Sequence, residues 1–212
     1  MYKRQAPNHD GLYGDNIINS SGAIHHFKQF NNLKNHYEIN TKNLITCIIG
    51  GENNHYNFSK ENTLDLCERI KKIKSYNDNQ EILVITSRRT NQEIKHILKK
   101  ELNSISKLWI GEGKNPYEFA LYNSSYFIIT SDSTSMISEA SISGKPIYVY
   151  QLPMKRKSKR FIRFHEEFKK MNITKDFNTL DKLENWTYTK LEESKRIAGI
   201  IKKRIIERKN ES

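Results

Sequence analysis

The sequence predicts an α/β protein built on a Rossmann-like parallel sheet, and two observations carry this prediction. Five short, predominantly apolar runs alternate with longer segments of helical spacing. The runs lie at residues 44–50, 81–86, 107–110, 126–130 and 147–150. Short apolar runs are typical of strands buried on both faces, and their alternation with helices is typical of a parallel, doubly wound sheet.

Residues 126–150 contain the clearest strand–helix–strand unit. The apolar run at 126–130 ends in a turn of small hydroxyl and carboxylate side chains, which can cap a helix. We expect that helix at residues 135–143, because Gly144 is suited to end it and Pro146 prevents its continuation. The turn therefore lies at the carboxyl end of a parallel strand, where open α/β sheets bind ligands.

The remaining helices are predicted from caps and apolar spacing. Ser59 precedes a helix at 60–76, and Thr90 is expected to cap a helix at 91–102. Further helices are predicted at residues 117–122, 155–170 and 191–208. We expect three regions along the chain, namely a junction segment at 1–40, a Rossmann-like domain at 41–152 and a basic helical tail at 153–212.

Composition narrows the class of protein. The chain has 212 residues, a net charge of +12 and two cysteines, Cys47 and Cys67, without disulfide or metal spacing. No apolar stretch reaches the roughly 20 residues that span a bilayer, and Met1 to Gly22 contains no secretory signal. We therefore expect a cytoplasmic protein with no metal site and no cofactor.

The positive charge is concentrated in the last part of the chain. Residues 151–212 contain 18 Lys and Arg against 9 Asp and Glu, which is nine of the twelve net charges. Such a tail can contact anionic lipid at the inner face of the membrane, or it can be a solvated helical surface. Aromatic interleaving and nucleic-acid motifs are absent, so nucleic acid is not an expected partner.

Four predicted strand ends carry polar or glycine residues that could bind a ligand at one edge of the sheet. The candidate ligand-binding residues are Gly50, Gly51, Ser87, Arg88, Arg89, Thr90, Asn115, Tyr117, Ser131, Asp132, Ser133, Thr134, Ser135 and Glu139. Arginines and backbone N–H groups suit phosphate, and a carboxylate suits ribose hydroxyls. Each residue alone has an ordinary alternative: a turn for Gly50 and Gly51, a cap for Asp132, and an exposed surface for the arginines.

The order of these motifs resembles a known family. Gly50-Gly51, Ser87-Arg88-Arg89-Thr90, Asn115-Pro116-Tyr117 and the segment from Thr130 to Ala140 are similar to motifs of the plant mitochondrial fission factors called elongated mitochondria, which have many bacterial relatives. Asn8-His9-Asp10 resembles the domain-junction motif of that family. The Ser/Thr-rich turn with Glu139 is more distantly similar to the donor half of GT-B glycosyltransferases.

The resemblance implies a nucleoside diphosphate or nucleotide sugar as the ligand. In the GT-B class the glycine turn and helix N-termini hold the diphosphate, and a glutamate holds the ribose. By this resemblance Gly51, Ser87, Arg88 and Arg89 would bind phosphate, whereas Ser133, Thr134 and Glu139 would recognise the ribose. Asn115 and Tyr117 would shape the wall of the pocket.

Two functions stay open at this point. The first is the nucleotide-sugar-binding, carboxyl-terminal half of a GT-B glycosyltransferase-like protein, whose amino-terminal domain would precede this chain. The second is a non-catalytic, membrane-associated adaptor. His9 and Asp10 are the only candidates for acid–base catalysis, and a junction turn explains them as well. We therefore expect the isolated chain to bind nucleotide without transferring sugar.

Overall fold

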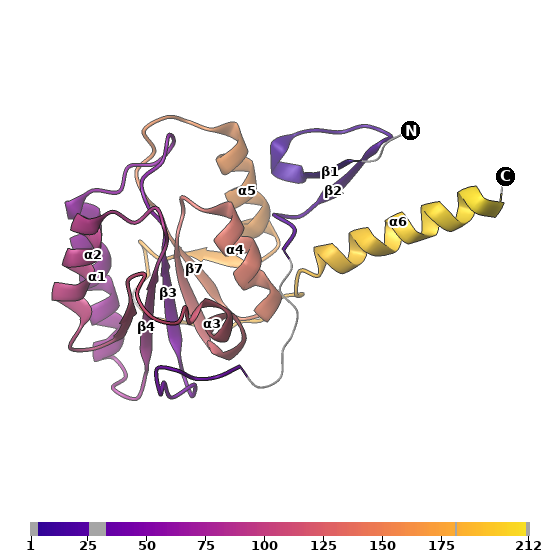
Figure 1. The fold of residues 1–212 in the computed structure, drawn as a ribbon. Coiled ribbons are helices and arrows are strands. Elements are labelled where there is room, and N and C mark those ends of the chain that lie inside the picture. Colours follow the sequence, from indigo (N-terminus) through magenta and orange to yellow (C-terminus); the bar gives the residue numbers. More distant parts are fainter. Residues whose placement is uncertain (1–3, 26–32, 181, 211–212) are drawn as a thin grey trace.

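A computed structural model describes residues 4–25, 33–180 and 182–210, and its centre is a six-stranded sheet (Figure 1). The strands follow the order β5-β4-β3-β6-β7-β8, and every neighbouring pair is parallel. Their bounds are β3 Ile45–Ile49, β4 Ile82–Thr86, β5 Lys107–Trp109, β6 Tyr126–Thr130, β7 Ile147–Tyr150 and β8 Thr174–Asp176. The predicted fold class and the five predicted strands are thus confirmed.

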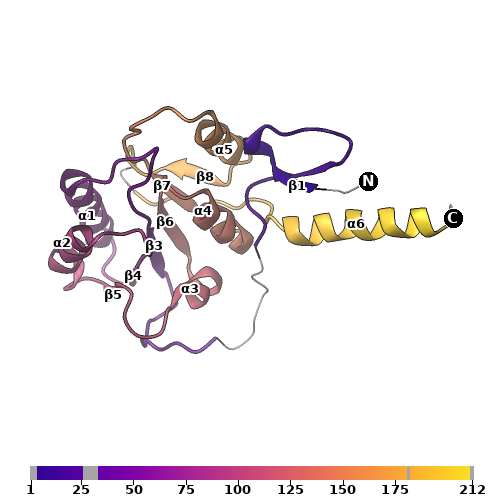
Figure 2. The same cartoon turned by 45° about the horizontal axis from the view of Figure 1, so that its top comes forward.

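Helices cover both faces of this sheet (Figures 1 and 2). One face carries α1 Lys60–Ser75 and α2 Gln92–Leu102. The other face carries α3 Tyr117–Asn123, α4 Thr134–Ala140 with the 3-10 turn η2 Ser141–Ser143, and α5 Lys159–Lys170. The chain builds outward from β3 to β5 and then crosses back to β6 on the other side of β3. The carboxyl ends of β3 and β6 therefore form the topological switch point of the sheet.

Helix caps explain where the helices begin. Ser59 and Asn62 form a capping box at the start of α1, as the sequence suggested for Ser59. The expected cap of α2 is wrong, because Asn91 rather than Thr90 accepts the hydrogen bond from the Ile94 backbone N–H at 2.8 Å. Thr90 instead binds backbone carbonyls at the end of β3, and its hydroxyl is therefore unavailable as a cap.

The core is divided between the two faces of the sheet. β3, β4 and β7 consist entirely of buried residues, which is the pattern of strands covered on both sides. One cluster packs α1 and α2 against the sheet, and a second packs α4 and α5 against the opposite face. Both cysteines are buried and free, and burial raises the pKa of Cys67 to about 12.

The α/β unit extends beyond the boundary that we expected at residue 152. Helix α5 packs its buried Phe164 and Phe168 onto the sheet, and β8 pairs with β7 in parallel register. Residues 153–176 are therefore part of the layered domain and not of a separate helical tail. The sequence missed β8 because the run Thr-Lys-Asp is short and polar, as suits a strand at the edge of a sheet.

The first residues form a small parallel pair, β1 Arg4–Pro7 and β2 Ile17–Ser20, separate from the main sheet. Asn8 donates to the Glu167 carboxylate at 2.6 Å, and the Arg163 guanidinium donates to the His9 carbonyl oxygen at 2.7 Å. These bonds join the pair to α5. Residues 1–3 and 26–32 of the expected junction segment lie outside the described residues.

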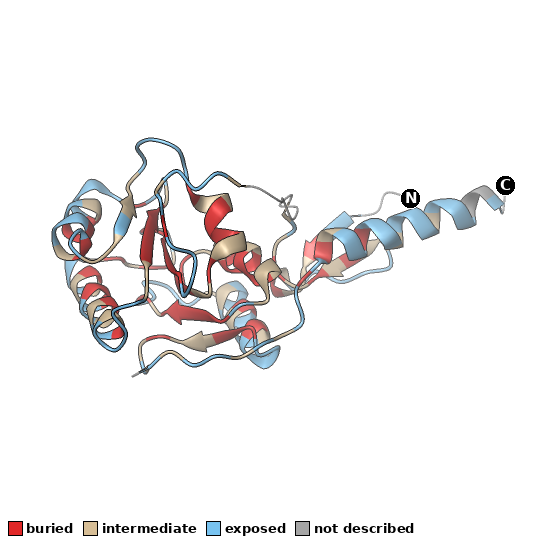
Figure 3. Cartoon of the chain, turned by 90° about the horizontal axis from the view of Figure 1, so that it is seen from below, coloured by how far each residue is buried: buried red, intermediate tan, exposed pale blue. Residues whose placement is uncertain are grey.

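The last helix, α6 Glu193–Asn210, projects from the layered domain (Figures 1 and 3). Only its beginning is anchored, where Glu193 accepts from the Ser21 backbone N–H at 2.9 Å and pairs with Arg196. Beyond that turn the helix is largely exposed, including Ile201 and Ile205 (Figure 3). Every helix in the described part of the chain is too short or too polar to span a lipid bilayer.

Candidate functional site

A buried carboxylate organises the switch point between β3 and β6. The side chain of Asp132 is 0 % exposed and follows β6 by two residues. Its Oδ2 accepts the Gly51 backbone N–H at 3.1 Å, and its Oδ1 accepts the Thr130 hydroxyl at 2.6 Å. Thr130 in turn accepts the Gly50 backbone N–H at 2.8 Å. The two amides at the end of β3 are thus bound within the chain by side chains from β6 and its loop.

The glycine pair is required by how closely the neighbouring loops approach. A Cβ atom on Gly50 would overlap the Asp132 carboxylate, and one on Gly51 would overlap the backbone carbonyl oxygen of Arg89. Neither glycine has a positive φ, so close approach and not backbone conformation is the reason for glycine here. The turn brings the end of β3 against both the β4 and the β6 loops.

The loop after β4 closes the other side of the switch point. Its chain is held by Thr90, whose hydroxyl accepts the Ser87 backbone N–H at 3.0 Å and donates to the carbonyl oxygens of Ile49 and Gly50. The Ser87 hydroxyl accepts the Arg89 backbone N–H at 3.2 Å. Ser87 and Thr90 therefore hold the backbone of the loop in place and fix the positions of its two arginines.

Two arginines of the loop after β4 lie at this edge. Arg89 places Nη2 2.7 Å from Asp132 Oδ2, with its own side chain 40 % exposed. Arg88 is exposed next to it. Burial raises the pKa of Asp132, and the hydrogen bonds from Thr130 and Gly51, together with Arg89, oppose that shift. Burial of a carboxylate costs free energy because it disfavours the charged form. A carboxylate buried at the switch point of a sheet in spite of this cost is typical of functional sites.

A second group of candidates lies on the helical face that carries α3 and α4. The Tyr117 hydroxyl, at the start of α3, donates to Oε2 of Glu139 in α4. The Asn115 side chain accepts the Tyr117 backbone N–H at 2.9 Å and so fixes the first residue of α3. Burial and the nearby Glu139 charge raise the pKa of Tyr117 far above its ordinary value. The three residues form one hydrogen-bonded group.

The hydroxyl-rich turn before α4 has mainly structural contacts. Ser133 is the N-cap, and its hydroxyl accepts the Met136 backbone N–H at 3.4 Å. The Ser131 hydroxyl accepts the Leu152 backbone N–H at 3.0 Å, which ties the turn to the end of β7. Thr134 is buried, whereas Ser135 is exposed. Of the turn residues, Ser135 is the most accessible to a ligand.

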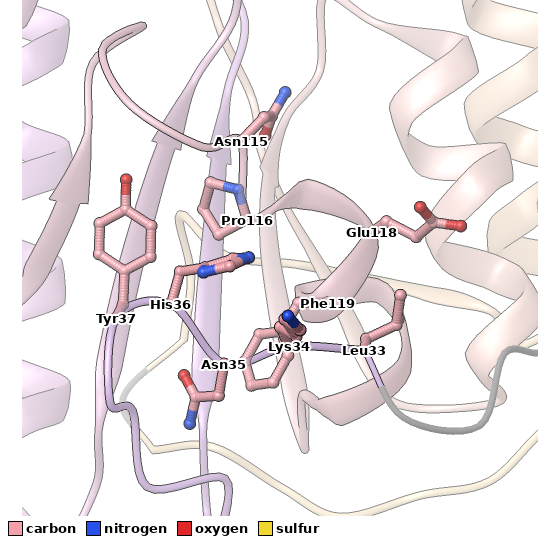
Figure 4. A pocket seen from close by; sticks show the side chains of 9 residues that line it. All are labelled: Leu33, Lys34, Asn35, His36, Tyr37, Asn115, Pro116, Glu118 and Phe119. Carbon is pink, nitrogen blue, oxygen red and sulfur yellow. The ribbon is translucent and has the colours of Figure 1, made fainter.

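A small cavity of about 130 Å³ lies beside the second group (Figure 4). Side chains from segment 33–37 line one side, and Asn115, Pro116 and Phe119 line the other. The Tyr37 hydroxyl donates to the Lys114 carbonyl oxygen at 3.3 Å, so this segment supports the loop before α3. The sequence analysis did not connect residues 33–37 with the candidate loops, since nothing in their pattern indicates that contact.

The acid–base candidates His9 and Asp10 lie against α5. His9 is 1 % exposed, and its ring packs edge-on against Phe164. Its Nε2 lies 3.8 Å from Oδ1 of Asp10, which binds Arg160 at 2.8 Å. Burial lowers the pKa of His9. In this position His9 is a neutral group under a helix, and Asp10 is part of a surface ion pair.

Sequence reasoning missed three residues that hold the switch point together. Thr130 bridges Gly50 and Asp132, and the Asn53 amide donates to the Asp132 carbonyl oxygen at 3.2 Å. His165 of α5 places Nε2 3.0 Å from the Ser131 carbonyl oxygen, and burial lowers its pKa to about 4. Thr130 and Asn53 lie next to the recognised loops in sequence, which was their only signal, and His165 carried none. Among the described residues, no cluster of three or more His, Cys, Asp or Glu could hold a metal ion.

Solved structures share this fold. The S. aureus MnaA–UDP co-structure superimposes with a TM-score of 0.51 and 13 % sequence identity. The match covers 81 % of this chain and 43 % of that protein. At this identity the similarity concerns the fold alone.

Sequence comparisons give the family. The uncharacterized protein RP120 of Rickettsia prowazekii (strain Madrid E) is 35 % identical over 177 residues, covering 80 % of this chain and 49 % of that protein. The mitochondrial fission protein ELM1 of Arabidopsis thaliana is 27 % identical over 130 residues, covering 60 % of this chain and 30 % of that protein. The chain thus spans about half, or less, of the length of these relatives. The profile of the mitochondrial fission ELM1 family matches residues 5–205. This chain belongs to that family.

Proposed function

We propose that the chain binds the nucleoside diphosphate part of a nucleotide sugar at the carboxyl edge of its sheet, as the nucleotide-binding half of a GT-B glycosyltransferase-like protein. The observation that carries this proposal is the exposed arginine pair at the switch point, where open α/β sheets bind ligands. A nucleoside diphosphate is anionic, and guanidinium groups are suited to phosphate because they offer several N–H donors in one plane.

The phosphate end would meet Arg88 and Arg89. Asp132 binds one guanidinium nitrogen of Arg89, and a guanidinium has five N–H donors in all. Asp132 therefore orients Arg89 while leaving donor capacity for a phosphate. The amides of Gly50 and Gly51 already donate to Thr130 and Asp132, so in this proposal the glycines serve the shape of the crevice more than phosphate contact.

The ribose end would meet Glu139. Its carboxylate can accept hydrogen bonds from sugar hydroxyls, and it belongs to the helix that begins at the switch point. The S. aureus structure with a similar fold contains UDP, which supports a uridine nucleotide as the first ligand to test. Asn115 and Ser135, which are both exposed, are further candidates for contact with the ligand.

Calorimetric titration of UDP tests the phosphate role. We expect Arg88→Ala and Arg89→Ala each to weaken UDP binding by about 1.5–3 kcal/mol, roughly a 10- to 150-fold rise in Kd, because each removes charge-assisted hydrogen bonds. Lys100→Ala is the matched control: it removes the same charge from the last turn of α2, near the opposite edge of the sheet. Its Kd should stay within about twofold of the wild type.

Two results would contradict the proposal. If the wild-type chain shows no UDP binding at millimolar concentration, the crevice is not a uridine nucleotide site. If all three variants lose affinity equally, the arginines act only through net charge, and the site must lie elsewhere.

A second candidate function is attachment to an anionic membrane surface, and one patch favours it. Arg156, Lys157 and Lys159 are exposed at the start of α5, and the apolar side chains of Met154 and Ile162 are also exposed there. Exposed cations beside apolar side chains suit the boundary between lipid headgroups and acyl chains. Lys155 and Arg160 add less positive charge to this patch, because Lys155 pairs with Glu52 and Arg160 pairs with Asp10.

Sedimentation with liposomes separates the two candidates. If the patch binds lipid, binding should require anionic headgroups, and Arg156→Glu with Lys157→Glu should reduce it strongly, since each basic residue near such a surface contributes about 1 kcal/mol. Lys202→Glu with Lys203→Glu on α6 makes the same change in charge at another place. Equal sedimentation with neutral and anionic liposomes would leave the patch as a solvated surface.

A further inference from the structure

The two side edges of the main sheet differ in what lies next to them. Beside β8, the indole N–H of Trp186 donates to the Asn172 carbonyl oxygen at 2.9 Å, and the Lys175 ammonium lies 4.6 Å from the centre of the Trp186 ring. The following segment of the chain therefore covers that edge. The opposite edge is β5, the first strand of the order β5-β4-β3-β6-β7-β8 (Figure 2). An edge strand presents backbone groups that can pair with another chain.

Hydrogen bonds show which backbone groups of β5 face outward. The Ser87 backbone N–H donates to the last residue of β3 at 2.8 Å, so the preceding residue, Thr86, faces β5. The Thr86 hydroxyl donates to the Trp109 carbonyl oxygen at 3.3 Å, which places the backbone groups of Trp109 on the side of β4. Successive peptide groups of a strand point to opposite sides. The N–H and C=O groups of Leu108 and Ile110 therefore point away from β4, toward the edge of the sheet.

A groove of about 250 Å³ lies beside this edge, on the face of the sheet that carries α2. Leu108 and Ile110 line it from the strand, and Lys99 and Asn103 line it from the end of α2. Leu108 is only partly buried, although it packs against the core beneath α1 and α2. Alternate residues of a strand share a face, so a strand added beside β5 would place every second side chain over this groove.

The surroundings of the groove are basic. Lys99 and Lys107 are exposed, and the Lys95 ammonium lies 3.5 Å from the position that a Cβ atom of Gly111 would take, just past the end of β5. Glu112 contributes one carboxylate to the lining. The whole chain carries a net charge of +12, so a second copy would be repelled from this edge, whereas an acidic partner would be attracted to it.

We infer that β5 is a docking edge for an extended, acidic segment of another polypeptide, which joins the sheet as a further strand. Backbone hydrogen bonds to Leu108 and Ile110 supply affinity, and apolar side chains at alternate positions of the segment enter the groove. Carboxylates of the segment pair with Lys95, Lys99 and Lys107. The same lysines disfavour basic strands, as charged residues on sheet edges generally do. This inference concerns a side edge of the sheet and does not depend on nucleotide binding at the carboxyl ends of the strands.

Fluorescence anisotropy with labelled peptides tests the inference on the full chain. The probe is a hexapeptide of alternating glutamate and valine. Its matched control carries N-methyl groups on adjacent central residues, which block both edges of the peptide but keep its charge and side chains. The chain should bind the unmodified peptide at least about 10-fold more tightly than the methylated one, because only the former can pair with the backbone of β5. Equal affinities, or no binding at millimolar concentration, would overturn the inference.

Two charge variants locate the binding on the chain. Lys99→Glu with Lys107→Glu should weaken binding of the unmodified peptide by about 10-fold or more, because both exposed cations beside the groove are reversed. Lys202→Glu with Lys203→Glu makes the same change in net charge on α6 and should alter the affinity by less than about twofold. Equal losses in the two variants would mean that the peptide follows net charge and not this edge, which refutes the docking site.

Light scattering checks the competing occupant, a second copy of the chain. A monomer in the absence of peptide is the expected result, given the repulsion between two chains of net charge +12. A dimer that dissociates when the unmodified peptide is added would show that β5 pairs with β5 of a second copy. That result would refute an acidic partner at this edge.

Discussion

Replacing Asp132 with alanine is expected to destabilise the chain by about 2–5 kcal/mol. The substitution leaves the Gly51 backbone N–H and the Thr130 hydroxyl buried without their acceptor, and each unpaired buried group costs about 1–3 kcal/mol. Relief of the buried charge offsets part of that cost, as the raised pKa of Asp132 indicates. Urea unfolding at neutral pH measures the difference.

Two variants sharpen this test. Asp132→Asn keeps one acceptor oxygen and should cost less than alanine. Glu68→Ala, which removes an exposed carboxylate paired with Lys71 on α1, should change the free energy of unfolding by no more than about 0.5 kcal/mol. An Asp132→Ala chain as stable as the wild type would mean that the network does not hold the switch point together.

The same variants connect stability to the proposed ligand. Asp132 fixes Arg89 as well as the Gly51 amide, so its loss should also weaken UDP binding. Asp132→Asn should lower affinity because it removes the charge that orients Arg89, even where the fold is retained. If Asp132 had only a structural role, the folded Asp132→Asn chain would bind UDP with the affinity of the wild type.

Much of the fold followed from the sequence because its strands are buried on both faces. Such strands are apolar throughout and end at glycine or hydroxyl residues, so their positions along the chain were readable from the pattern. β8 and β1 were not readable, because edge strands and short pairs carry polar residues that resemble loops. Strands that are exposed to solvent have a weaker pattern of apolar residues in the sequence than buried strands.

The candidate site was readable only in part, and the reason is again physical. Strand ends in a parallel sheet must share an edge, so the loops carrying Gly50, Arg89 and Asp132 could be grouped from sequence alone. Which side chain binds which cannot be deduced from that grouping. Asp132 was considered a cap or a ligand contact; within the chain it binds the Gly51 amide and Arg89, and contact with a ligand stays a prediction. Tyr117 and Glu139 were assigned separate roles, although they contact each other.

The buried His9 and the partly buried His165 of α5 should make the chain sensitive to acid. Burial lowers the pKa of His165 to about 4 and also lowers that of His9, against an ordinary value of 6.5. Lys169 and His9 add to the shift of His165, whereas its bond to the Ser131 carbonyl oxygen opposes it. The unfolded chain therefore takes up protons near pH 6.5, where the folded chain does not.

The sign and window of the effect follow from this difference. Stability from these residues is complete above about pH 6.5 and is lost as the pH falls toward 4, because protonation then favours the unfolded state. For His165 alone the full difference is about 3 kcal/mol, of which about 2 kcal/mol is lost between pH 7.5 and pH 5. Most carboxylates titrate below that interval, so it isolates the histidines.

Urea unfolding at pH 7.5, 6 and 5 measures this loss. His165→Gln keeps an N–H donor for the Ser131 carbonyl oxygen but cannot be protonated, so the fall in stability between pH 7.5 and pH 5 should shrink by about 2 kcal/mol. His96→Gln replaces an exposed histidine on α2 and should leave the pH dependence unchanged. Equal slopes in both variants would show that His165 takes up its proton at the same pH in the folded and the unfolded chain. His165 would then have to be protonated while its ring packs against Phe164 and its Nε2 lies 3.0 Å from the Ser131 carbonyl oxygen, and its half-buried position argues against protonation without cost.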